Sequence, residues 1–423
     1  MNFANHFKDE KPLLKIALGI SILWVIAQIV LIACFWGYPQ SGDTGAYISM
    51  AQHCFNNKRW YPMAEDVYST WIWTPGFINY LILQLRIFGT VNFNDVSNLF
   101  LNIAILLEVY YLSKKFFSKR TGLISVIIFC LFYSNLLIVL GAKTEIPFLF
   151  LCLSALCLVF SGKWKYVIGA ALLFALANWI RPLAIIFLFA SVVYFLITKA
   201  KFYNYIALII PYIFALFIIG TVTEKKIGYF VYQSTTSGYN LLMTSHDNAK
   251  GSVNHYIFNE EGGAGFIENR DLLTFAETDS IWMARSFKWI KEHPVKFAVL
   301  FLKKIPALYI HDAWPFSGYW WDETITENFS KKDDDASKNI FAKKLLIQSL
   351  ISIPYYLTFF LFFYSLWTNR KKILSVKSIF LIIFITGTII TCIFPVGMRY
   401  HYPFMFTVII YAAWGLDAKT PPS

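Results

Sequence analysis

Long apolar runs constrain the fold of this 423-residue chain more than any motif in it. Runs long enough to cross about 30 Å of hydrocarbon begin near residues 13, 97, 121, 146, 165, 182, 204, 345, 378 and 402. Hydrophobic residues make up 57% of the chain and charged residues only 15%, which is typical of a bilayer protein. We therefore expect an all-α polytopic membrane protein with about ten transmembrane helices.

Short basic clusters between the apolar runs predict the topology. The clusters contain Lys114, Lys115, Lys119 and Arg120; Lys163 and Lys165; Lys199 and Lys201; and Arg370, Lys371, Lys372 and Lys377. They account for much of the net charge of +12 and do not form a nucleic-acid-binding stripe. Short basic loops stay in the cytoplasm. All four clusters can lie in the cytoplasm only if residues 75–89 and residues 294–310 do not cross the membrane. We therefore expect these two stretches to form juxtamembrane helices at the outer surface.

Two large segments of the single membrane domain, residues 1–423, then face outward: residues 36–96 and residues 222–344. Charged or titratable side chains gather where the spans end on this side. They are Asp43, Glu145 in "GAKTEIPF", Arg181 in "NWIRPLA", and Arg399 with His401 in "PVGMRYHYP". Charges at membrane depth are costly and usually face a cavity. Their position predicts a site at the outer membrane surface.

These residue types suit a reaction on a lipid-linked sugar. A carboxylate such as Asp43 can act as a general base toward an acceptor hydroxyl, and Tyr47 follows it by one helical turn. Arginines can neutralise a phosphate that docks and then departs. Nucleotide sugars are absent outside the cytoplasmic membrane, so an activated sugar has to arrive on a lipid phosphate. Lys303 and Lys304 could also bind that phosphate, or lipid headgroups.

An ordered series of short motifs resembles the GT-C class of membrane glycosyltransferases. The motifs are "AYISMA", "WTPGF", "TEIPFLFLCLSAL", "WIRPLAIIFL", "GYNLLMTSHDNAKG", "KEHPVKFAVLFLKKIPALY" and "RYHYPFMFTVIIYAAWGL". Within that class the chain is most similar to bacterial relatives of protein O-mannosyltransferases and of the lipid A aminoarabinose transferase. The resemblance implies a GT-C fold and an inverting transfer of a monosaccharide from polyprenyl phosphate to an acceptor hydroxyl. Asp43 then matches the catalytic acid of the first outer loop, and Glu145 the acid of the second.

The resemblance further implies the substrates and the location. The expected partners are a polyprenyl-phosphate-linked sugar, membrane lipids, and a glycan, lipid or protein acceptor, with no nucleic acid. Asp43 is followed by Thr44, whereas protein O-mannosyltransferases have consecutive Asp and Glu, and no appended ligand-binding domain is present; both differences put a protein acceptor in doubt. No metal is expected to be obligatory, although a divalent ion remains an alternative. The expected location is a bacterial inner membrane, with substrate-binding Tyr47, Arg181, Arg399, His401 and Lys303 on its extracytoplasmic face.

Simpler roles stay open for the same residues. Asp43 could cap a helix beginning at Thr44, Glu145 could be a first-turn acid, and Arg181 could be an interfacial snorkelling residue. Two other functions would also place charges in a membrane cavity. One is a transporter or flippase of lipid-linked sugars, and the other is a polymerase or ligase of lipid-linked glycans.

Overall fold

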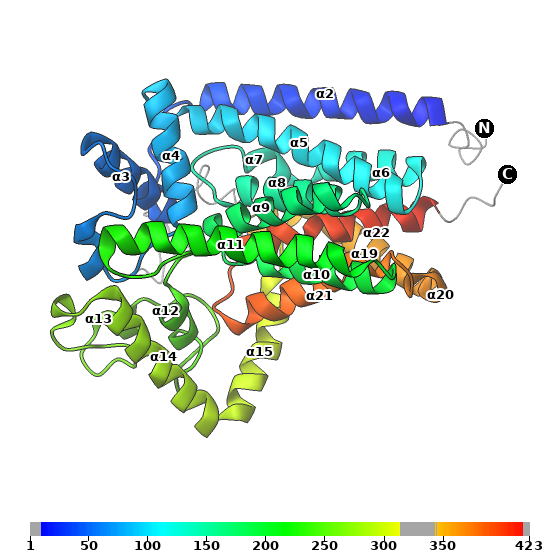
Figure 1. Cartoon of the computed structure of the whole chain (residues 1–423). Helices are drawn as coiled ribbons and strands as arrows, with labels where there is room; N and C mark the ends of the chain where they lie inside the picture. Colours follow the sequence, from blue (N-terminus) through cyan, green and yellow to red (C-terminus); the bar gives the residue numbers. More distant parts are fainter. Residues whose placement is uncertain (1–9, 314–342, 344, 418–423) are drawn as a thin grey trace.

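The structure is a computed structural model that describes residues 10–313, 343 and 345–417. All regular secondary structure in these residues is helical. Apolar helices of 13 to 26 residues lie side by side in one bundle (Figure 1). They are α2 (Glu10–Cys34), α5 (Phe93–Phe116), α6 (Lys119–Leu131), α8 (Glu145–Val159), α9 (Trp164–Ile180), α10 (Ala184–Ile197), α11 (Phe202–Ile227), α19 (Ile353–Thr368), α21 (Ser378–Ile393) and α22 (Met405–Asp417).

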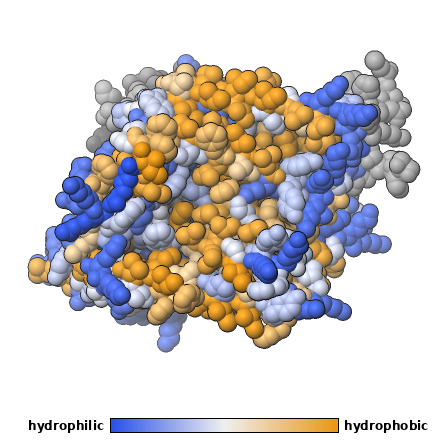
Figure 2. All heavy atoms as spheres, turned by 45° about the horizontal axis from the view of Figure 1, so that its top comes forward, coloured by the Kyte–Doolittle hydropathy of each residue, from blue (hydrophilic) through white to orange (hydrophobic). Residues whose placement is uncertain are grey.

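The apolar surface supports a membrane protein. Among the described helices, α2, α5 and α11 are long and apolar enough to cross a membrane, and a bent pair, residues 345–351 and 353–368, would be a fourth span. Helices α8, α9, α10 and α21 are apolar but have 15, 17, 14 and 16 residues. At 1.5 Å per residue each is shorter than the roughly 30 Å core. The expected ten spans are therefore not confirmed. Figure 2 shows an apolar band between two polar ends on one face.

The start of α2 and the end of α22 lie at the same end of the bundle (Figure 1). Lys119 Nζ lies 2.7 Å from Glu10 Oε2, and Arg120 Nε lies 3.6 Å from Asp417 Oδ1. These ion pairs bring the starts of α2 and α6 next to the end of α22. The arrangement agrees with the parity argument, which placed these basic clusters on the same side.

The opposite end of the bundle, which we call the outer end after the predicted topology, carries the segment predicted as the first outer loop. It contains α3 (Gly42–Asn56), η1 (Ala64–Tyr68) and α4 (Pro75–Phe88). Helix α4, the predicted juxtamembrane helix, runs across the bundle direction in Figure 1. Its Gly76 allows a close crossing, because a Cβ there would lie 2.8 Å from the Trp179 carbonyl oxygen. Thr74 also donates a hydrogen bond to the Ile180 carbonyl. These contacts fix α4 against the end of α9.

A second outer unit follows α11, which continues to Ile227, past the predicted boundary at residue 222. It contains α12 (Ser237–Leu242), α13 (Tyr256–Asn259), η2 (Arg270–Leu272), α14 (Phe275–Glu292) and α15 (Pro294–Leu308). Helix α14 begins with a capping box between Thr274 and Glu277. Trp282 packs in a small core with Tyr239 and donates to the Gly265 carbonyl at 2.7 Å. The remainder of the predicted segment, residues 314–342 and 344, lies outside the described residues.

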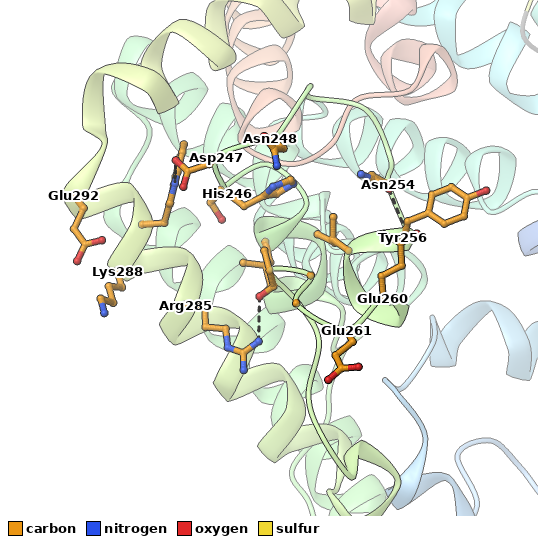
Figure 3. Close-up of a pocket in the computed structure, with 17 residues that line it drawn as sticks. His246, Asp247, Asn248, Asn254, Tyr256, Glu260, Glu261, Arg285, Lys288 and Glu292 are labelled. Atoms are coloured by element: carbon orange, nitrogen blue, oxygen red, sulfur yellow. Dashed lines mark hydrogen bonds between the residues drawn. The ribbon is translucent and has the colours of Figure 1, made fainter.

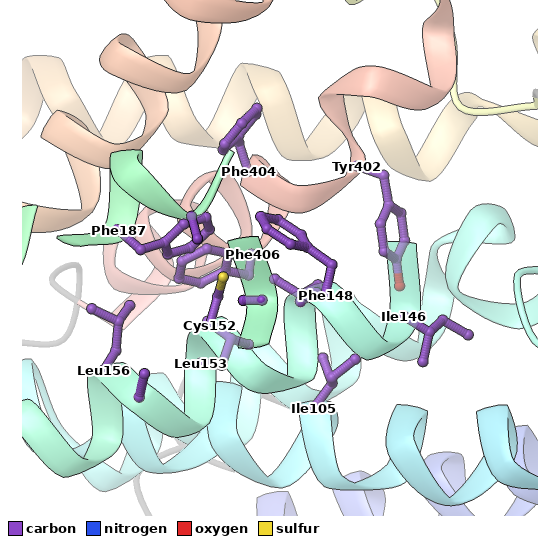
Figure 4. Packing of buried hydrophobic residues seen from close by; sticks show 14 of the residues in the cluster. Ile105, Ile146, Phe148, Cys152, Leu153, Leu156, Phe187, Tyr402, Phe404 and Phe406 are labelled. Carbon is purple, nitrogen blue, oxygen red and sulfur yellow. The ribbon is translucent and has the colours of Figure 1, made fainter. Parts of the chain in front are cut away.

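An apolar core packs between α8, α10 and the segment that leads into α22 (Figure 4). Phe148 and Cys152 of α8 face Phe187 of α10, and the Phe187 ring stacks on Phe406 of α22 at 6.3 Å. All four side chains are almost fully buried. The remaining short elements are α7 (Tyr133–Leu137), α20 (Arg370–Ile373) and η3 (Met398–Phe404), which leads into α22. Close packing of this kind holds the first turn of α8 and the η3 turn in fixed positions.

Candidate active site

Four charged side chains from distant parts of the chain meet at the outer end of the bundle. Asp43 lies in the first turn of α3, and Glu145 is the first residue of α8. Arg181 follows the last residue of α9, and Arg399 lies in η3. The structure thus brings together the residues that the sequence placed at outer span ends.

The four charges form two ion pairs with different exposure. Arg181 Nη1 lies 2.6 Å from Glu145 Oε1, where the two side chains are 13% and 3% exposed. Arg399 donates a hydrogen bond to Asp43, and these side chains are 33% and 39% exposed. The first pair is therefore a buried element of the site. The second pair faces the outside and is open to a ligand.

Tyr400 lies between the two guanidinium groups. The Cζ atom of Arg181 is 5.9 Å from the ring centroid of Tyr400, and that of Arg399 is 5.4 Å from it. At these distances both cations interact with the same ring. Tyr400 was not among the residues singled out from the sequence. Its place between Arg399 and His401 in "RYHYP" was the only available signal.

Tyr47 and Lys143 complete the polar group. Burial, together with the charge of Asp43, raises the pKa of Tyr47, so its hydroxyl stays protonated at neutral pH. Burial lowers the pKa of Lys143, while the carboxylate of Glu145 opposes that shift. Lys143 was also missed from the sequence, although it stands in the same motif as Glu145, "GAKTEIPF". The group thus contains Arg181, Arg399, Lys143, Asp43 and Glu145, and Asp95 lies within electrostatic reach of Lys143.

The simpler roles considered for the two carboxylates can now be compared with the helix boundaries. Helix α3 begins at Gly42 and its N-cap is Ser41, so Asp43 does not cap a helix beginning at Thr44. Asp43 and Glu145 both occupy first turns, where the helix dipole favours a negative charge. This placement is compatible with a role in chemistry.

His401 is enclosed in the protein. Its Nδ1 lies 2.8 Å from the Leu308 carbonyl oxygen, and its Nε2 lies 3.5 Å from Asp312 Oδ1. The side chains of His401 and Asp312 are 0% and 1% exposed. These contacts join η3 to the end of α15. Because His401 is enclosed and holds η3 against the end of α15, the geometry supports a positioning role for it rather than the predicted contact with substrate.

Lys303 and Lys304 point in different directions from α15. Lys303 is exposed and takes no part in the two ion pairs of the site. Lys304 is 2% exposed, and its Nζ lies 3.3 Å and 3.2 Å from the carbonyl oxygens of Ile393 and Phe394. It therefore binds orphan carbonyls at the end of α21. The sequence did not distinguish the two lysines.

Lys304 makes the stability of the protein depend on pH. Burial lowers its pKa from 10.5 to about 8. Between these two values the unfolded chain holds a proton that the folded chain has released, so the free energy of unfolding rises with pH. We expect Lys304→Met to remove a rise on the order of 2 kcal/mol, measured by thermal unfolding in detergent between about pH 7.5 and pH 10. The control is Lys303→Met, which should keep the wild-type rise; an unchanged rise in Lys304→Met would contradict the assignment.

No three His, Cys, Asp or Glu side chains within the described ranges come together as a group that could hold a metal ion. The polar group at the outer end is built instead from two carboxylates and three cations. Whether the protein requires a metal stays a prediction, and the chemistry below uses the side chains alone.

No protein-family model matches this chain, and no curated protein sequence matches it. A similar solved structure is that of the archaeal oligosaccharyltransferase AglB from Archaeoglobus fulgidus, in complex with an inhibitory peptide and a dolichol-phosphate. The similarity covers 95% of this chain and 50% of that chain, with 12% sequence identity and a TM-score of 0.49. This chain thus spans about half the length of that protein. Because this similarity is low, the proposed function rests on the residues of this chain alone.

Proposed function

We propose that this protein is a GT-C-type membrane glycosyltransferase that transfers a monosaccharide from a polyprenyl phosphate to an acceptor hydroxyl. The observation that carries the proposal is the open Asp43–Arg399 pair beside the buried Glu145–Arg181 pair. A carboxylate suited to act as a base and a guanidinium suited to bind a phosphate contact each other at one end of the apolar helices. The choice of sugar and of acceptor, whether a glycan, a lipid or a protein, would depend on the shape of the surrounding loops.

The arginines of the site suit an anionic donor. Arg181 and Arg399 are paired with Glu145 and Asp43, and Lys143 lies within electrostatic reach of Glu145, Asp43 and Asp95. A lipid phosphate would compete with Asp43 for Arg399. Arg399 is one-third exposed, so it can turn from Asp43 to a bound phosphate. Donor binding would thereby release the Asp43 carboxylate to act as a base.

The reaction then follows from the positions of these groups. Asp43 accepts the proton of the acceptor hydroxyl as that oxygen attacks the anomeric carbon of the sugar. The bond from that carbon to the phosphate oxygen breaks, and its electron pair leaves with the polyprenyl phosphate. Arg399 stabilises the charge that develops on this leaving group. One in-line displacement inverts the anomeric configuration. Glu145 holds Arg181 in place, and we assign it a positioning role.

The test is a transfer assay with wild-type protein purified in detergent. The substrates are a panel of polyprenyl-phosphate monosaccharides, offered with glycan, lipid and peptide acceptors. We expect at least one donor to be consumed, with release of polyprenyl phosphate and an inverted linkage, detected by mass spectrometry and NMR. If every donor stays intact while proteoliposomes move a lipid-linked sugar across the bilayer, the protein is a transporter and the proposal is wrong. Consumption of lipid-linked oligosaccharides alone would instead indicate a ligase or polymerase.

A further inference from the structure

A cavity of about 710 Å³ lies in the second outer unit, separate from the charged site (Figure 3). One wall is α14, which contributes Arg285, Lys288, Trp289 and Glu292. The other wall is the segment from residue 246 to residue 264, including α13. None of the residues that line it belongs to the two ion pairs of the site. It is large enough to hold a small organic ligand.

The charges of the cavity disfavour an anionic ligand. Four carboxylates line it, those of Asp247, Glu260, Glu261 and Glu292, against the two cations Arg285 and Lys288. Arg285 Nη1 donates to the carbonyls of Ala264 and Phe266 at 3.0 Å and 2.8 Å, so this group is directed at the backbone. The carboxylates accept hydrogen bonds, and an uncharged ligand rich in hydroxyl groups could donate them.

His246 provides a buried polar group that lacks a partner. Its side chain lines the cavity, and the residue is 8% exposed. Its Nε2 has no hydrogen-bond partner among the described residues. Burial lowers the pKa of His246, so the ring is neutral at pH 7. A buried unsatisfied nitrogen costs free energy, and a ligand hydroxyl in the cavity would satisfy it.

Tyr256 presents an aromatic face at the rim of the cavity. The residue is 71% exposed, and Asn254 Oδ1 accepts a hydrogen bond from its backbone N–H at 3.2 Å. Figure 3 shows its ring extending from the start of α13. A tyrosine ring offers an apolar body and a polar tip. An exposed ring at the rim of a cavity lined by carboxylates and amides suits a sugar, which has apolar C–H faces and polar hydroxyl edges.

Aromatic rings connect this unit to the proposed active site. The ring centroids of Tyr239 and Trp71 are 4.4 Å apart, those of Trp71 and Trp73 are 5.3 Å apart, and those of Trp73 and Tyr47 are 5.5 Å apart. Tyr239 packs with Leu242, which lines the cavity. Burial, and after it the charge of Asp43, raises the pKa of Tyr239 to about 12, so Asp43 lies within electrostatic reach. The rings of Tyr239, Trp71, Trp73 and Tyr47 therefore contact one another in series between the core beneath the cavity and the region of Asp43.

We infer that the cavity binds an uncharged glycan and that this glycan is the acceptor chain. The body of the glycan lies against Tyr256 and His246, and its terminal residue follows the rings of Trp71 and Trp73 toward Asp43. The inference that a glycan binds depends only on the cavity. The inference that this glycan is the acceptor rests on the proposed glycosyl transfer. Among the acceptor classes left open above, the cavity favours a glycan over a peptide or a lipid.

The binding test uses purified full-length protein and free oligosaccharides without any donor. The panel contains neutral, N-acetylated and uronic-acid-containing oligosaccharides, and dissociation constants come from isothermal titration. We expect neutral or N-acetylated members to bind, and uronic acids to bind at least about tenfold more weakly because of the four carboxylates. Tyr256→Ala and His246→Ala should each weaken binding about tenfold or more. The matched control is Tyr68→Ala, which removes a tyrosine that is 60% exposed outside the cavity, and it should bind as wild type does.

Several results would overturn the inference. They are no binding across the panel, a preference for uronic acids, or wild-type binding by both Tyr256→Ala and His246→Ala. Because Tyr256 is exposed, its variant should fold even if His246→Ala does not. Glycan binding without any sugar transfer would refute the proposed function but support the binding site. Transfer to a glycan with an unchanged KM for that glycan in Tyr256→Ala would refute the acceptor site but support the proposed function.

Discussion

Asp43→Asn is expected to lower the rate of sugar transfer by about 10²- to 10⁴-fold, the usual contribution of a general base. The side chain keeps its size and remains able to accept a hydrogen bond from Arg399, so the local structure should persist. What it loses is the capacity to take the acceptor proton. The measurement is single-turnover transfer from a polyprenyl-phosphate sugar by variant and wild-type protein, with donor binding determined separately. We expect kcat to fall while donor affinity stays within a few-fold of wild type.

A matched control separates this effect from a general loss of negative charge. Asp271 lies in η2, and its side chain is 100% exposed. Asp271→Asn removes the same charge outside the two ion pairs of the site, so its transfer rate should match that of wild type. Near-normal kcat in Asp43→Asn would refute the general-base assignment. Loss of donor binding together with kcat would instead give Asp43 a positioning role, through its contact with Arg399.

Much of the site could be predicted from where charges interrupt the apolar runs. Asp43, Glu145, Arg181 and Arg399 stand at predicted outer span ends, and parity alone brings such ends to one side of the membrane. The pairing could not be predicted in the same way. Asp43 and Arg399 are separated by 356 positions in the sequence, and no local pattern states which arginine meets which carboxylate. Only the packing of α3 against α4 and of η3 against α22 decides it.

The fold shows a similar division between local pattern and packing. The parity of the basic loops predicted that residues 75–89 form a helix that does not cross the membrane, and α4 runs across the end of the bundle. The count of about ten spans assumed that each apolar run forms one continuous helix. The run from residue 121 instead breaks at Phe132, whose backbone is extended, and the run from 402 begins in the 3₁₀ turn of η3. Hydropathy records the length of a run and does not record such breaks.

Side-chain direction on a helix was the least predictable level. Lys303 and Lys304 have the same chemistry and adjacent positions, but consecutive helical residues point about 100° apart. One is exposed, and the other binds the end of α21. His401 likewise stands two residues from Arg399 and faces the interior of the protein. The outer cavity was also missed, because Tyr256, His246 and Glu292 form no motif along the chain.

Breaking the buried ion pair should strongly destabilise the protein. Arg181→Met leaves the Glu145 carboxylate, which is 3% exposed, without its partner at 2.6 Å. Removing one member of a buried pair typically costs about 3–5 kcal/mol, because the remaining charge is uncompensated. Glu145→Gln should be destabilising for the same reason, with Arg181 left unpaired. The measurement is the free energy of unfolding in mixed detergent micelles, followed by the fluorescence of the tryptophans.

The double variant separates stability from chemistry. Glu145→Gln with Arg181→Met removes both charges, so we expect it to recover most of the stability that either single change loses. Sugar transfer should remain low, because the site has then lost a cation that helps to hold the lipid phosphate. As a control, Lys296→Met breaks an exposed pair with Asp247 and should change stability by less than about 1 kcal/mol. If the double variant transfers sugar at the wild-type rate, the Glu145–Arg181 pair has only a structural role. Asp43 and Arg399 would then carry the reaction on their own.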